Sequence, residues 1–222
     1  MNASPFVLQL LNALAALLLL LSFAMLAQRR VVTLVNLLAL QGGILCAATL
    51  LLAWRTGEAN LYVSAALTFS LKVCLLPWLL HRMIRRFGVY WDTDTLLNIP
   101  GTMLIGLVVV VFSFGLAQPI TALASTATRS AVGIAVAVIL LAFLTMITRR
   151  KAMSQVVGFL SMENGLFFGA MSATYGMPMI VEMGVALDVL VAMLVLGVFL
   201  FKIREQFDSL DLEHLGPGEE EP

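Results

Sequence analysis

Seven long apolar runs constrain the fold of this chain more than any other feature. A helix needs about 20 apolar residues to cross a hydrocarbon core of roughly 30 Å. The runs are continuously apolar rather than alternating, which excludes a transmembrane β-barrel. The sequence therefore predicts an all-α membrane protein with seven transmembrane helices. The seven runs are Phe6–Ala27, Val31–Trp54, Leu61–Leu80, Pro100–Ala117, Ser130–Thr148, Ala152–Ala173 and Pro178–Phe201.

The composition agrees with a membrane location. The chain is 61% hydrophobic and 12% charged, whereas about a quarter of the residues in soluble domains are charged. Neither Lys nor Arg precedes the first run, so we expect a spanning helix there and not a cleaved signal peptide. Cys46 and Cys74 lie inside apolar runs without metal-ligand spacing. We expect buried free thiols, no bound metal or cofactor, and no nucleic-acid partner.

The basic residues predict the orientation of the chain. Ten of the 13 Lys and Arg residues lie on alternate turns between the runs, and positively charged turns favour the cytoplasmic side. We therefore expect the N-terminus outside and the C-terminus in the cytoplasm. The ten residues are Arg29, Arg30, Arg82, Arg85, Arg86, Arg149, Arg150, Lys151, Lys202 and Arg204.

A weak internal repeat predicts how the helices are grouped. The segment Gln41-Gly42-Gly43 in the second run aligns with Glu163-Asn164-Gly165 in the sixth. The run that follows each segment carries one central ionisable residue, Lys72 or Asp188. We predict a first three-helix unit at 1–90 and a second at 130–204. Between them, 91–129 holds an interfacial segment, a linking fourth helix and an outer loop, and 205–222 is an acidic cytoplasmic tail.

Three ionisable residues near the middle of the runs are the candidate functional residues: Lys72, Glu163 and Asp188. At about 1.5 Å of rise per residue, each lies roughly 15 Å from either membrane surface, beyond the reach of snorkelling. A charge at this depth costs about 2.5–3.5 kcal/mol on insertion scales. Each group therefore needs a partner, a hydrated pocket or a neutral state. We interpret the three as a proton-translocation relay; the alternative is a static ion pair that locks helices together.

For each of two further polar residues, the sequence leaves two roles possible. Glu182, six residues before Asp188, either feeds a path from the outer side or is solvated at the interface. Gln41 either hydrogen-bonds a buried charge or joins two helices. Pro77 follows Lys72 by five positions and is expected to disturb the helix there. Three glycines of the sixth run are expected to allow close helix packing: Gly158, Gly165 and Gly169.

The segments Met162-Glu163-Asn164-Gly165 and Val185-Ala186-Leu187-Asp188 carry a family resemblance. The chain resembles the hydrogenase-4 component E family, membrane subunits of energy-converting nickel–iron hydrogenases and formate hydrogenlyase-type complexes. The second half is also similar to the K subunit of NADH:quinone oxidoreductase and to the C subunit of Mrp-type antiporters. The K subunit has a central glutamate in each of two successive helices, and Glu163 and Asp188 match these two positions.

The resemblance implies a non-catalytic subunit of a proton-pumping membrane arm in a bacterial or archaeal cytoplasmic membrane. Its neighbours would be antiporter-like subunits, and redox chemistry would take place on a peripheral hydrogenase-type module of other chains. Two alternatives remain open, namely an Mrp-type cation/proton antiporter component without a redox partner and a purely structural subunit. A seven-helix retinal photoreceptor fits poorly, because the only intramembrane lysine, Lys72, lies in the third run.

Overall fold

A computed structural model describes the chain over residues 5–57, 59–87, 90, 98–121 and 126–173, and at positions 183, 184, 186, 187, 189–191, 193 and 197. The described part is helical and contains no strand, which confirms the predicted all-α class. The third helical stretch contains a π-helical segment, η1, between α3 and α4. The elements are α1 (Pro5–Ala27), α2 (Val31–Thr56), α3 (Ala59–Thr68), η1 (Phe69–Leu75), α4 (Leu76–Phe87), α5 (Ile99–Thr121), α6 (Thr126–Thr148) and α7 (Ala152–Ala173).

Six helical stretches in the described part are long and apolar enough to span a membrane, and they coincide with the first six predicted runs. The chain is therefore a multi-pass membrane protein. Helices α5 and α6 extend into the outer loop that was predicted between the fourth and fifth runs, because polar residues can continue a helix beyond its apolar run. The seventh run, Pro178–Phe201, lies largely outside the described residues, although the described positions within it are helical. The seventh span and the orientation of the termini stay predictions.

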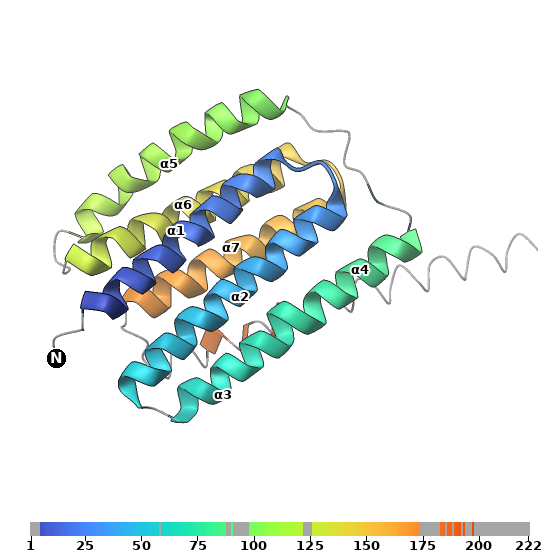
Figure 1. Cartoon of the computed structure of the whole chain (residues 1–222). Coiled ribbons are helices and arrows are strands. Elements are labelled where there is room, and N and C mark those ends of the chain that lie inside the picture. The colour runs from blue at the N-terminus through green and yellow to red at the C-terminus, as the bar shows by residue number, and fades with distance from the viewer. Residues whose placement is uncertain are drawn as a thin grey trace, which may run out of the picture.

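The helices form a bundle with two edges (Figure 1). Helix α5 packs on α6 and α1 at one edge, and the α3–η1–α4 stretch packs on α2 at the other. Between these edges, α7 packs against both α6 and α2. A Cβ atom added at Gly158 would lie 2.7 Å from Met146 Cγ, and one at Gly165 would lie 2.9 Å from Val138 Cγ1. These glycines, with Gly169 beside Ala135, thus allow α7 to approach α6 closely, as predicted.

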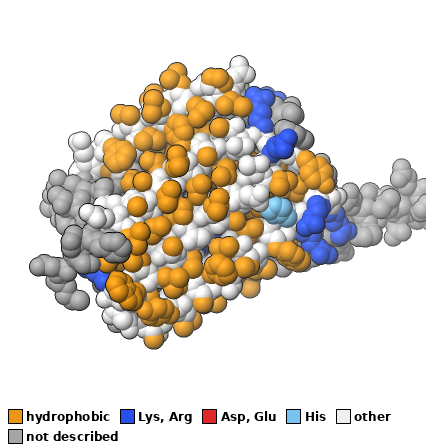
Figure 2. All heavy atoms as spheres, viewed as in Figure 1, with side chains coloured by type: hydrophobic (Ala, Val, Ile, Leu, Met, Phe, Trp, Pro, Cys, Tyr) orange, Lys and Arg blue, Asp and Glu red, His pale blue; other side chains and the backbone are white. Residues whose placement is uncertain are grey.

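A buried arginine connects α6 to α1 at one end of the bundle. Arg149, at the end of α6, is only 4% exposed and donates hydrogen bonds to the carbonyl oxygens of Met25, Leu26 and Gln28. These carbonyls belong to the end of α1 and the turn after it, where a helix leaves acceptors without intrahelical donors and where positive charge is favourable. The basic turns that follow α1 and α6 therefore lie at the same end of the bundle. On the face in Figure 2, lysine and arginine side chains gather towards one end.

Hydrophobic side chains cover much of the face of the bundle in Figure 2, as expected of a surface that faces lipid. Exposed leucine, valine and phenylalanine side chains cover much of α5. Cys46 is buried, and its thiol donates a hydrogen bond of 3.4 Å to the carbonyl of Ala65. Cys74 is exposed, so the expectation that both thiols are buried was wrong for this residue. Lys72 lies two positions before Cys74, about 200° around a helix, so the buried lysine and the exposed thiol lie on nearly opposite faces.

Candidate functional site

Lys72 enters the bundle from the widened helical turn of η1. The backbone N–H of Leu76 bonds to the carbonyl of Leu71, five residues back. Pro77 has no N–H to offer to the preceding turn, so the predicted disturbance is confirmed and takes the form of a π-helix. The backbone of Lys72 lies directly on α2, since a Cβ atom added at Gly42 would be 2.8 Å from Lys72 Cβ. The absent side chain of Gly42 thus makes room for η1.

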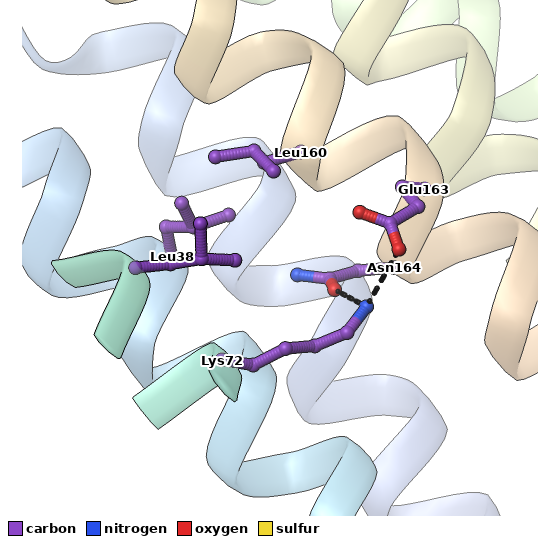
Figure 3. A pocket seen from close by; sticks show the side chains of 6 residues that line it. Leu38, Lys72, Leu160, Glu163 and Asn164 are labelled. Carbon is purple, nitrogen blue, oxygen red and sulfur yellow. Dashed lines mark hydrogen bonds and ion pairs between the residues drawn. The ribbon is translucent and has the colours of Figure 1, made fainter. Parts of the chain in front are cut away.

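The ammonium group of Lys72 meets two neighbouring residues of α7 (Figure 3). Lys72 Nζ lies 3.3 Å from Glu163 Oε1 and donates a hydrogen bond of 2.7 Å to Asn164 Oδ1. The side chains of Lys72 and Glu163 are each 4% exposed. The Phe167 ring centroid is 5.4 Å from Nζ, within range of a cation–π interaction. Two of the three ionisable candidate residues, Lys72 and Glu163, are therefore in contact with each other.

A chain of hydrogen bonds continues from Asn164 across the bundle. Asn164 Nδ2 donates to Gln41 Oε1 at 3.4 Å, and Gln41 Nε2 donates to Ser22 Oγ at 2.8 Å. Ser22 Oγ donates to the carbonyl of Leu18, one turn earlier in α1, at 2.9 Å. Buried polar side chains from α1, α2, η1 and α7 thus form one connected group. We call this group the polar layer; its members are Ser22, Gln41, Lys72, Glu163 and Asn164.

The polar layer separates two apolar clusters of the core. In each of its helices, a residue of one cluster precedes the polar residue and a residue of the other cluster follows it. The polar side chains therefore lie between two water-excluding regions, where polar groups are costly unless they are paired. The first cluster contributes Met25, Leu38, Leu76 and Leu160, and the second contributes Leu18, Leu45, Leu61 and Phe167.

A small cavity lies beside the ion pair (Figure 3). Its volume is about 10 Å³, close to the minimum of about 10–15 Å³ that holds one water molecule. Its lining combines apolar side chains with three polar ones that can bond a water molecule. The arrangement suits a site where a proton is held or exchanged. The lining residues are Leu38, Lys72, Leu76, Leu160, Glu163 and Asn164.

Asp188 and Glu182, the other predicted ionisable groups, lie outside the described residues. Two described residues of the same run lie near the polar layer. Gly184 lies directly against the ring of Phe167, the aromatic neighbour of Lys72. Val191 is buried in the cluster that contains Leu38 and Leu160.

Asn164 and Ser22 were not predicted as site residues, although Asn164 lies in a segment that the sequence analysis singled out. A polar side chain inside an otherwise apolar run was the available signal for both. That signal is weak, because hydroxyl side chains often bond to a carbonyl of their own helix. Thr145 does so in α6, bonding to Leu141. Over the described part of the chain, no group of three or more His, Cys, Asp or Glu side chains is placed to hold a metal ion.

Comparison with known proteins gives two relationships. No family model and no solved structure matches the chain. Hydrogenase-4 component E of Escherichia coli is 25% identical over 156 residues, covering 70% of this chain and 72% of that protein. The uncharacterized protein Rv0085 of Mycobacterium tuberculosis is 37% identical over 182 residues, covering 82% of this chain and 83% of that protein. At this identity and coverage, the chain belongs to the same family as Rv0085, with hydrogenase-4 component E as a more distant relative.

Proposed function

We propose that this chain is a non-catalytic membrane subunit of a hydrogenase-type complex and that its Lys72–Glu163 pair takes part in proton translocation. The apolar helices and the distant relationship to hydrogenase-4 component E fit a membrane subunit of such a complex. The partners would be further membrane subunits, among them antiporter-like ones, with a peripheral hydrogenase module bound indirectly. The membrane would be the bacterial or archaeal cytoplasmic membrane.

The buried ion pair is the observation that carries the proposal. Moving one proton from Lys72 Nζ to Glu163 Oε1, 3.3 Å away, breaks an N–H bond, forms an O–H bond and leaves two neutral groups. Burial disfavours both charges, whereas their mutual attraction favours them. These effects oppose each other. We therefore propose that the pair keeps its charges at rest and that a disturbance during turnover triggers the transfer of the proton.

Asp188 is proposed as the group that exchanges protons with this pair. Gly184 and Val191, four positions before it and three after it, both lie near the polar layer. Asp188 itself lies outside the described residues, and we propose it for this role because it is the third ionisable residue near the middle of an apolar run. Glu182, closer to the predicted outer end of the run, would connect Asp188 with the outer side.

Proton translocation in the assembled complex tests the proposal. We would tag the full chain, purify it in mild detergent and analyse the preparation for nickel, iron and partner subunits. In inverted membrane vesicles, Glu163→Gln should abolish redox-driven proton uptake while dye-linked redox activity stays. Thr145→Val is the matched control, because its buried hydroxyl bonds to its own helix outside the polar layer.

Other outcomes would favour the alternatives. Proton uptake unchanged by Glu163→Gln in a normally assembled complex would indicate a structural subunit and contradict the proposal. Sodium-dependent proton exchange in a preparation without nickel and iron would indicate an Mrp-type antiporter component.

A further inference from the structure

We infer that Ser22, Gln41 and Asn164 are positioning residues that hold the Lys72 ammonium against Glu163 and do not themselves conduct protons. This inference rests on the proposed function of the ion pair. It divides the polar layer by role. Protons are exchanged at the Lys72–Glu163 pair, whereas a row of hydrogen bonds, which runs from Asn164 of α7 to Gln41 and Ser22 on the α1–α2 side, fixes the geometry.

The two ends of the row determine the direction of every hydrogen bond in it. A lysine ammonium only donates, so Asn164 has to turn its carbonyl oxygen towards Lys72, at 2.7 Å. The amide nitrogen of Asn164 then points to Gln41, whose own nitrogen points to Ser22. At the far end, the backbone carbonyl of Leu18 only accepts, and it takes the hydroxyl proton of Ser22. Donors and acceptors therefore match along the whole row.

Because the row is buried, the position of the Lys72 ammonium depends on every donor in the row keeping its acceptor. Ser22, Gln41 and Asn164 are at most 2% exposed, so bulk water cannot replace a lost bond. If one member is removed, a buried donor or acceptor loses its partner. Reorientation of the Asn164 amide is the cheapest relief, and it would withdraw the carbonyl oxygen from Lys72.

The chemistry of amides explains why the row does not conduct. A relay group must accept a proton at one atom and release one from another, as hydroxyl, carboxyl and water can. Carboxamides of Asn and Gln offer fixed donors and a fixed acceptor, and they take up or lose a proton only at extreme pH. Two amides in series therefore close the α1–α2 side to protons. Exchange is left to the Lys72–Glu163 pair and the cavity beside it.

Ser22 offers the sharpest test, because its substitution changes the least volume. In the assembled complex, Ser22→Ala should lower the proton uptake per electron transferred about two- to tenfold, the effect of losing a hydrogen bond of about 0.5–1.5 kcal/mol. Ser22→Thr restores the hydroxyl and should restore most of the uptake. Gln41→Met, similar in shape but without the amide, is the second variant, and Thr145→Val is again the control.

The outcomes separate this inference from the proposed function. Uptake unchanged in both Ser22→Ala and Gln41→Met would overturn the positioning role, even if Glu163→Gln blocks uptake. Complete loss in Ser22→Ala, equal to that in Glu163→Gln, would show that the row conducts and would also overturn it. Equal loss in Ser22→Ala and Ser22→Thr would indicate a packing effect and count against it. Normal uptake in Glu163→Gln would instead contradict the proposed function itself.

Discussion

At the scale of single residues, Lys72 and Glu163 each compensate the buried charge of the other. Removal of one partner from a buried ion pair leaves an uncompensated charge and costs about 3–5 kcal/mol. We therefore expect Lys72→Met to lower the free energy of unfolding by this amount. The double variant Lys72→Met/Glu163→Gln removes both charges and should recover much of the loss. Thermal and denaturant unfolding of the full chain in detergent would measure both.

The interaction energy from this double-mutant cycle shows whether Lys72 and Glu163 interact directly. A double variant that is less stable than either single variant, by the sum of their effects, would contradict a direct interaction at 3.3 Å.

Gly42 and Gly43 allow a second prediction at this scale, because they are adjacent and differ in their surroundings. A Cβ atom at position 42 would lie 2.8 Å from Lys72 Cβ, whereas one at position 43 would meet nothing within 4 Å. Gly42→Ala should therefore cost about 1–3 kcal/mol through overpacking and lower proton uptake by displacing Lys72.

Gly43→Ala is the control and should be neutral or stabilising by up to about 1 kcal/mol, because alanine favours the helix. Equal stability of the two variants, measured by thermal unfolding, would argue against the close approach of α2 and η1.

The sequence identified the charged members of the site and Gln41, but not Asn164 and Ser22. Lys72 and Glu163 stand out because a charge inside an apolar run is rare and costly. Asn164 and Ser22 cost much less to bury, and nothing in a single sequence distinguishes a bond across helices from one within a helix. Ser22 makes both kinds of bond, whereas the hydroxyl of Thr145 donates to the carbonyl of Leu141 within its own helix, α6.

At the scale of helices, Arg149 is expected to stabilise the end of α1. Its guanidinium donates to three backbone carbonyls there, and a hydrogen bond to a charged group contributes about 1.5–3 kcal/mol. Arg149→Gln should therefore destabilise the chain by at least this amount. The neighbouring Arg150 is exposed, so Arg150→Gln should change the unfolding free energy by less than about 0.5 kcal/mol.

A stability loss shared equally by the two arginine variants would point to a general effect of charge at this end and not to a cap on α1. Hydrogen exchange at the backbone amides of α1 would locate the effect, with faster exchange near Met25 expected in Arg149→Gln alone.

Helix positions were predicted better than helix shapes. Apolarity over about 20 residues located six helices, because burial in lipid requires it. Hydropathy did not place the ends of α5 and α6, since polar residues can extend a helix into water. Pro77 predicted a disturbance near Lys72, but it did not predict that the disturbed turn would be π-helical.

At the scale of the whole molecule, the number of spans can be tested from the two ends of the chain. Seven spans place the ends on opposite sides of the membrane, and the basic turns predict which end is outside. In a background of Cys46→Ala/Cys74→Ala, Asn2→Cys should react with a membrane-impermeant maleimide from outside the cell. Pro222→Cys should react only in inverted vesicles. Labelling of both from the same side would contradict seven spans.

The sequence also did not predict which helices pack against each other. The predicted repeat aligned Gln41 with Glu163, yet it did not say that the two segments would meet. In the structure, α2 packs on α7, and Gln41 bonds to Asn164, the neighbour of Glu163. Contacts of this kind depend on the order of helices around the bundle, which apolar runs of similar length do not specify.

The most direct test of the central claim is an infrared difference spectrum of the assembled complex, recorded between resting and turnover states. If Glu163 accepts a proton from Lys72, a band of a protonated carboxyl group should appear during turnover and be absent in Glu163→Gln. The same band should persist in Thr145→Val. A carboxyl band unchanged in Glu163→Gln, or no such band in the unaltered complex during proton uptake, would contradict the claim that this pair moves protons.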